Sequence, residues 1–317
     1  MRISPVRDLP GPQEQGGEEV RRISYPRLVL RARERLEHRD IHIWNMERKL
    51  AMALSPLEAF ENAIDRATHL IDLYNLLHNR RQRSVRSDWA RKFKEMMRWP
   101  QSADICRIDG EDAVLVIKDG TNWNLSDFQH EYLGEMLRAA LILSVSAFDR
   151  FNHDLVVKNV LGILRKPKTA WPKALADFPV PLSAAEEAIE WSIKQRRPPN
   201  PTQSRPRVKL KTRFRECLHE KTFQGFGQVG NALSMLGIAD PWSKISSTLG
   251  EPTTEIEKRL NSIVHRRNQI AHEGDVEQAS RPREVKLNPI SAPDVREDLE
   301  WLGKLGEAIS EVVDNEV

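Results

Sequence analysis

Residues 126–155 read SDFQHEYLGEMLRAALILSVSAFDRFNHDL, and this stretch decides the fold. Within it, residues 139–148 (AALILSVSAF) are apolar on nearly every side of a helix, apart from small serines. A helix of that kind is buried all round and belongs in the centre of a bundle. The sequence therefore predicts one long central helix, from Ser126 to beyond Leu155, with other helices packed around it.

The chain after the central helix has the apolar spacing and the end signals of further helices. Ser291 is a good N-cap for the last of them, and Gly274 is a good C-cap for the one before. The predicted helices span residues 207–221, 226–236, 241–248, 253–272 and 292–313. The fold class predicted for the chain is therefore mainly α, with a helical bundle over residues 123–317.

The N-terminal part divides into two predicted regions. Residues 1–30 are rich in proline, glycine and mixed charge, which predicts a flexible arm. Residues 31–122 form an N-terminal helical region, in which Ser55-Pro56 is the expected start of one helix. Alternating residues and the pair Asp109-Gly110 predict a small β-hairpin near residues 105–117.

Composition restricts the class of protein and its compartment. The 317 residues are 39% hydrophobic and 30% charged with a formal net charge of +3, as in a well-solvated globular protein. Cys106 and Cys217 are the only cysteines, so we expect a reducing compartment and no structural zinc. No apolar run is long enough for a membrane span or a signal peptide, so we expect a cytoplasmic protein without membrane contact.

Positive charge is concentrated in two segments. Residues 80–98 hold eight Lys or Arg, and Trp89, Phe93 and the adjoining Trp99 are interleaved at helical spacing. This pattern fits either an amphipathic helix or RNA contact. Residues 195–215 hold eight Lys or Arg and no acid, which fits either a solvated linker or nucleic-acid contact. The candidate RNA-binding residues in this second segment are Arg205, Arg207, Lys209, Lys211 and Arg213.

Residues 253–275, TTEIEKRLNSIVHRRNQIAHEGD, carry the candidate chemistry. At about 100° per residue, the apolar side chains share one arc, and Arg267 lies near its middle. Because a lone buried charge is costly, Arg267 must pair with an acid, reach a cavity or face a partner. The apolar residues of this arc are Ile256, Leu260, Ile263, Val264, Ile270 and Ala271.

A polar stripe of Asn261, His265, Asn268 and His272 runs along another side of the same helix. Asn268 and His272 are one turn apart and can touch. Arg267 and His272 lie about 140° apart, so a frayed helix end, the long arginine or a second subunit must bring them together. Histidine suits proton transfer and arginine suits phosphate binding, so the pair fits metal-independent RNA cleavage.

The segment from Arg267 to Gly274 (RNQIAHEG) resembles the signature of the HEPN superfamily. Residues 143–155 (LSVSAFDRFNHDL) resemble the first long helix of the RiboL-PSP type of HEPN domain. The resemblance covers roughly residues 124–317 and implies a HEPN-like, up-and-down helical bundle of four or five helices. It also implies a homodimer, with two Arg/His pairs in one interfacial cleft. It also implies an endoribonuclease, often a toxin or anti-phage effector, whose 2′-OH attack leaves a 2′,3′-cyclic phosphate.

The resemblance implies roles for individual residues. Arg267 would hold the phosphate, His272 would transfer protons, and Asn268 would orient His272. Asp149 is expected either to pair with Arg267 or to be hydrated, and His153 either to line the cleft or, as favoured, to lie on the surface. Glu273 is a further supporting residue, and no metal or other cofactor is expected.

Two other functions remain open at this point. One is a catalytically silent HEPN scaffold, and the other is a nucleic-acid-binding adaptor that uses the two basic segments. The expected partners are RNA, a second copy of the chain, and an antitoxin or another protein of a defence system.

Overall fold

The computed structural model describes residues 54–78, 81–83, 85–109, 114–118, 125–179, 183, 186, 206–277 and 286–317. These residues belong to one compact unit, Leu54–Val317. Some predictions lie outside the described residues: the N-terminal arm, residues 31–53 of the N-terminal region, and the candidate residue Arg205.

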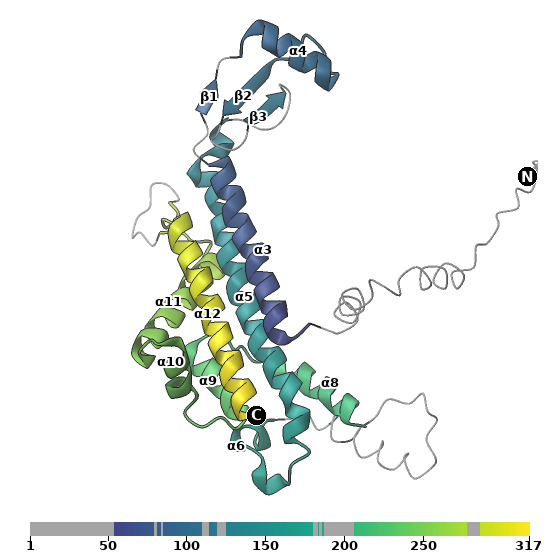
Figure 1. Cartoon of the computed structure of the whole chain (residues 1–317), viewed down its shortest axis with the longest axis vertical. Coiled ribbons are helices and arrows are strands. Elements are labelled where there is room, and N and C mark those ends of the chain that lie inside the picture. The colour runs from purple at the N-terminus through teal and green to yellow at the C-terminus, as the bar shows by residue number, and fades with distance from the viewer. Residues whose placement is uncertain are drawn as a thin grey trace, which may run out of the picture. The chain divides into compact units, whose positions relative to one another are not determined.

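The centre of the fold is the helix α5 (His130–Ile163), which begins four residues later than predicted and runs past Leu155 as expected. Its side chains Leu137, Leu141 and Phe148 are at most 1% exposed. Helix α3 (Pro56–Leu77) packs along α5, and the last helix, α12 (Ala292–Glu316), packs against both of them (Figure 1). The prediction of a mainly α bundle around one buried helix is confirmed.

Local sequence signals set where the outer helices begin. Ser55 and Glu58 form reciprocal bonds at the start of α3, where the Glu58 amide donates to Ser55 Oγ at 3.1 Å. At the start of α12, the Asp294 amide donates to Ser291 Oγ at 3.3 Å. Although α3 precedes residue 123, it shares the hydrophobic core of the later helices.

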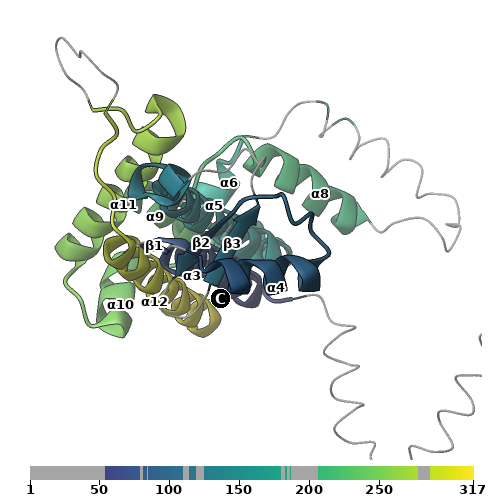
Figure 2. The same cartoon turned by 90° about the horizontal axis from the view of Figure 1, so that it is seen from above.

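Shorter helices cover the rest of α5. The four predicted helices that follow the linker are present as α8 (Pro206–Leu218), α9 (Phe226–Met235), α10 (Pro241–Leu249) and α11 (Thr253–Glu273). Helix α11 packs against α5, α9 and α10, whereas α8 packs against α5 (Figure 2). The 3₁₀ turns Leu125–Phe128 and Lys168–Ala170 flank α5, and the short α6 (Lys173–Ala176) lies against α9.

A small sheet lies between α3 and α5 in the sequence. The predicted hairpin is present as β2 (Ile105–Asp109) and β3 (Val114–Lys118), which pair antiparallel with Ile105 opposite Lys118. A third strand, β1 (Arg81–Arg83), pairs with β2 and was not predicted. Helix α4 (Ser87–Met97) connects β1 to β2.

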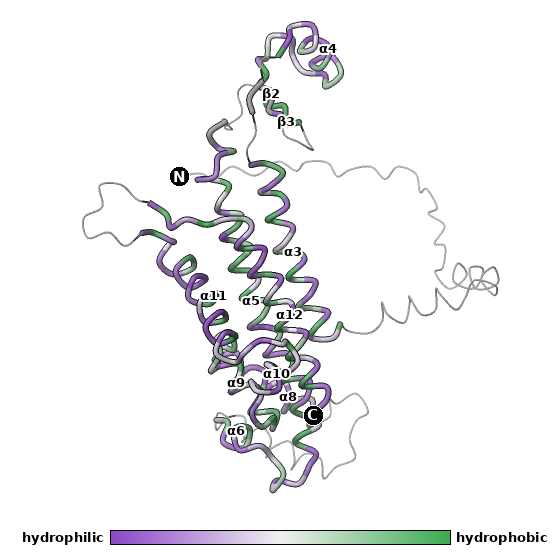
Figure 3. Tube along the Cα trace, turned by 60° about the vertical axis from the view of Figure 1, so that its left-hand side comes forward, coloured by the Kyte–Doolittle hydropathy of each residue, from purple (hydrophilic) through white to green (hydrophobic). Residues whose placement is uncertain are grey.

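Hydropathy along the chain matches these positions. Figure 3 shows α11 as a mainly hydrophilic helix, whereas hydrophobic residues recur throughout α5. Among the described helices, none is both long and apolar enough to cross a membrane.

Candidate functional site

The candidate site lies on the second half of α11, where this helix leaves the hydrophobic core. Ile256, Leu260 and Ile263 in the first half are at most 3% exposed. The predicted core face does not continue to the helix end, because Ile270 is only half-buried and Ala271 is exposed. The expected burial of the whole apolar arc was therefore wrong for its last turn.

Arg267 is half-buried and has no acidic partner among the described residues. Its Nη1 donates to Asn268 Oδ1 at 3.0 Å, and its Nε is buried without any hydrogen-bond partner. A buried donor without an acceptor is rare and calls for an explanation such as a ligand or a partner. Of the three explanations that the sequence offers for Arg267, pairing with an acid is therefore not observed within the described part of the chain.

His272 is exposed in the last turn of α11. Among the described residues, Arg267 donates to Asn268 and not to His272. Asn268, expected to orient His272, accepts a hydrogen bond from Arg267. Asn268 Nδ2 is a separate donor that this bond does not use, so the orienting role of Asn268 toward His272 stays a prediction. Glu273, the last residue of the helix, is exposed next to His272.

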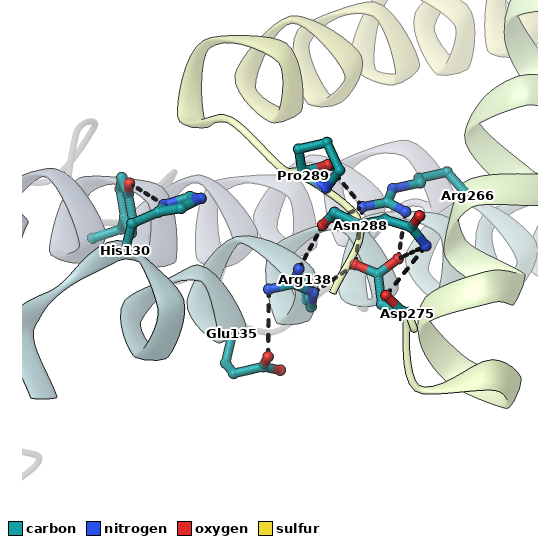
Figure 4. A network of polar contacts seen from close by, with 8 residues as sticks. His130, Glu135, Arg138, Arg266, Asp275, Asn288 and Pro289 are labelled. Atoms are coloured by element: carbon teal, nitrogen blue, oxygen red, sulfur yellow. Dashed lines mark hydrogen bonds and ion pairs between the residues drawn. The ribbon is translucent and has the colours of Figure 1, made fainter. Parts of the chain in front are cut away.

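The neighbouring Arg266 differs from Arg267, because its guanidinium donates to the carboxylate of Asp275 (Figure 4). The carboxylate of Asp275 is 0% exposed and accepts from Arg266 Nη2 at 2.9 Å and from Arg138 Nε at 2.6 Å. A second bond joins Arg266 Nη1 to Asp275 Oδ1, and Asn288 Nδ2 donates to that oxygen at 3.1 Å. We call Arg138, Arg266, Asp275 and Asn288 the aspartate clamp.

The aspartate clamp holds the chain just beyond α11. Gly274 and Asp275 both adopt left-handed backbone conformations, with φ of 64° and 57°. The Asn288 amide donates to the Asp275 carbonyl at 2.8 Å, and Arg138 Nη2 donates to the Asn288 carbonyl at 2.9 Å. The turn that follows His272 is therefore fixed to α5 by a buried charge network.

The sequence analysis missed the aspartate clamp. One signal was available: Arg138 lies between apolar residues of the central helix, where a charge needs a partner. The partner itself was not predictable, because Asp275 is 137 residues away.

Asp149 does not pair with Arg267 and is not simply hydrated. Its Oδ1 accepts a hydrogen bond from the Phe223 amide and lies 3.8 Å from His153 Nε2. His153 is only 8% exposed, so the favoured surface position was wrong. Its ring packs on Phe223 at 4.7 Å between centroids, and its Nε2 lies 3.0 Å from the Lys221 carbonyl.

Burial lowers the pKa of His153. The nearby Asp149 carboxylate opposes this shift, while His219 adds to it. His153 is therefore favoured in its neutral form, and its Nε2, which faces a carbonyl, carries the proton. A neutral ring packed against Phe223 explains how a histidine is accommodated on a buried face of α5.

The two basic segments differ in their surroundings. On α4, Trp89 stacks on Phe93 with ring centroids 4.9 Å apart, and Arg107 of β2 lies over Trp89. These aromatic side chains pack on one another, as in the amphipathic-helix interpretation. Helix α8 carries the other candidates at Arg207, Lys209, Lys211 and Arg213, and Arg213 pairs with Glu216 at 2.7 Å.

Tyr74, His78 and His130 form a polar cluster between the end of α3 and the start of α5. Tyr74 Oη lies 2.8 Å from His130 Nδ1, and the Tyr74 ring stacks on His78. Burial, followed by the proximity of His130, lowers the pKa of His78. A neutral His78 suits this contact between two helix ends.

The described residues contain no group of three or more His, Cys, Asp or Glu side chains placed to hold a metal ion. The chain offers instead a lone arginine and an exposed histidine on one helix end. Chemically, such a pair can bind an anion and exchange a proton with it.

Comparison with known proteins identifies the family of the chain. The sequence model of the RiboL-PSP-HEPN family matches residues 117–315, a range that begins at β3 and ends within α12. No curated protein and no solved structure matches the chain. The match extends over more than half of the sequence and includes α5, α11 and α12, so the chain belongs to the RiboL-PSP-type HEPN family.

Proposed function

We propose that the protein is a metal-independent endoribonuclease of the HEPN type that serves as a toxin or anti-phage effector. The supporting observation is the contrast between Arg266, saturated by Asp275, and Arg267, which has a buried Nε without a partner. HEPN membership supports a role in RNA cleavage or nucleotide binding. A half-buried guanidinium without an acid is suited to a phosphodiester, which it can bind with two parallel hydrogen bonds.

In the proposed reaction, the ribose 2′-oxygen attacks phosphorus and the bond to the 5′-oxygen breaks. A base takes the proton from the 2′-OH, and an acid gives one to the leaving 5′-oxygen. The products are a 2′,3′-cyclic phosphate and a 5′-OH end. His272 is the proton-transfer group, and Arg267 stabilises the charge that develops on the phosphate oxygens.

A homodimer is part of this proposal. Arg267 and His272 do not meet within one chain, whereas two copies of α11 in one interface bring two such pairs together. The aspartate clamp supports the arrangement, because it fixes the helix end that carries His272.

The test compares cleavage of total RNA in EDTA by wild type, Arg267→Gln and His272→Gln, with the new ends mapped. We expect the wild type to leave cyclic phosphate and each variant to lose at least about a hundredfold in rate. Lys258→Gln on α11 and His69→Gln on α3 are matched controls, since both residues are exposed. Both controls should cleave like the wild type.

Cleavage that survives in both site variants would disprove the assignment of Arg267 and His272. A protein that is inert in every form, yet binds RNA, would instead favour the adaptor. Adding extract from infected cells to the wild type and to both variants tests whether a missing activator explains inertness.

A further inference from the structure

Besides the candidate site on α11, the structure has a polar cleft between α5 and the end of α8. It has a volume of ≈ 460 Å³, and the residues that matter here are Asp149, His153, Asp154, Arg215, His219 and Lys221. No described residue of α11 lines it, so it is separate from the Arg267 and His272 pair. Figure 1 shows α8 and α11 on different sides of α5.

The acids of this cleft are already engaged. Asp149 accepts from the Phe223 amide, and Asp154 Oδ2 accepts from Arg150 Nε at 3.0 Å. Asp154 also lies 3.9 Å from Arg215. Neither carboxylate is therefore left to attract a cation from solution.

The cleft has more basic side chains than acidic ones. Lys221 is exposed with no acid within ion-pairing distance among the described residues, and Arg215 shares Asp154 with Arg150. His219 is also exposed, and its ring lies parallel to that of His153 with centroids 5.7 Å apart. An anion entering the cleft would meet lysine, arginine and imidazole donors together.

Helix α8 extends the positive charge away from the cleft. Arg207, Lys209, Lys211, Arg213 and Arg215 follow one another along the helix, and Glu216 is the first acid after them. Lys211 and Arg215 lie one turn apart on the same side, about 6 Å along the axis. Because Lys211 and Arg215 continue the positive charge of the cleft along one side of α8, the site suits a chain of phosphates better than a single phosphate.

We propose that the α5–α8 cleft binds a phosphate of single-stranded RNA away from the position of cleavage, with Lys221, Arg215 and His219 as its donors. This inference rests on the proposed function, because it takes RNA as the substrate. The cleft then fixes where the strand lies along α5, while Arg267 and His272 perform the reaction.

The test measures binding without cleavage, using a fluorescent 2′-O-methyl oligoribonucleotide, which lacks the attacking hydroxyl. Lys221→Gln and Arg215→Gln should each weaken binding about five- to tenfold at low salt and lower the salt slope by about 0.7. Lys304→Gln removes one exposed lysine of α12 that does not line the cleft, and this variant should bind like the wild type. Asp154 keeps Arg150 as a partner in Arg215→Gln, so the fold should be retained.

Wild-type affinity in both cleft variants would overturn the inference, even if RNA is cleaved. Weaker binding in both supports it, even if the Arg267 and His272 variants show no change in cleavage. A parallel titration with AMP follows the imidazole signals of His153 and His219. Signals that move with AMP but not with the oligonucleotide would assign the cleft to free nucleotides and overturn the strand assignment.

Discussion

At the scale of residues, Arg266 and Arg267 show how neighbours in sequence acquire different roles. Arg267 was identifiable from the sequence because its helical position placed a charge among apolar residues. The partners of Arg266 were not identifiable, because Asp275 and Asn288 reach it only through the turn beyond α11. Position on a helix can be read locally, whereas a charge network across the fold cannot.

The aspartate clamp leads to a prediction about stability. Asp275→Ala removes the carboxylate that Arg138 and Arg266 share. Arg138 is only 5% exposed, and its other acidic contact, with Glu135, is longer at 3.4 Å. Removing one partner of a buried ion pair costs about 3–5 kcal/mol, so the free energy of unfolding should fall by that amount. Urea denaturation followed by circular dichroism measures it.

Asp177→Ala is the control for this prediction, since Asp177 is exposed after the short α6. Its effect should stay within about 0.5 kcal/mol. A loss below about 1 kcal/mol in Asp275→Ala would show that the clamp contributes little to stability.

At the scale of elements, the helices were predictable wherever short-range signals mark them. Ser55, Ser291 and Gly274 act on their own helix ends, so α3, α11 and α12 appear close to their predicted bounds. Strand β1 was missed because its three residues, RQR, have neither apolar character nor alternation. Its existence depends on pairing with β2, which is a tertiary contact.

Two glycines of α12 give a matched test of helix packing. A Cβ at Gly306 would collide with the ring of Phe60 on α3, whereas a Cβ at Gly303 would meet nothing within 4 Å. Gly306→Ala should therefore lower the free energy of unfolding by about 1–3 kcal/mol, despite the better helix propensity of alanine.

Gly303→Ala should raise the free energy of unfolding by up to about 1 kcal/mol, since it gains propensity without a clash. Thermal melting of both variants beside the wild type measures the two changes in stability. An equal shift in the two would mean that α3 and α12 are not in the close contact described above.

At the scale of the whole molecule, the proposed dimer needs an uncovered surface. Tyr132 and Leu143 of α5 are 62% and 48% exposed, whereas Leu137, Leu141 and Phe148 of the same helix are buried. Tyr132 and Leu143 are 11 residues apart, so they lie within about 20° of one another around the helix. This apolar stripe is a suitable surface for a second copy of the chain.

Leu143→Glu should convert the dimer to a monomer and reduce RNA cleavage at least about tenfold, because a buried charge disfavours the interface. Sedimentation velocity at several concentrations measures the oligomeric state. Leu76→Glu on α3 changes another exposed leucine and should leave both properties unchanged. A Leu143→Glu protein that remains dimeric would place the interface elsewhere.

The aspartate clamp also bears on how the protein is made. Its members are Arg138 on the central helix, and Asp275 and Asn288 beyond α11, so the complete network cannot close until the chain has been made as far as Asn288. The buried Leu302 and Leu305 of α12 follow later still. The helix end that carries Arg267 and His272 is therefore fixed in place only after segments 137 residues apart in the sequence have met.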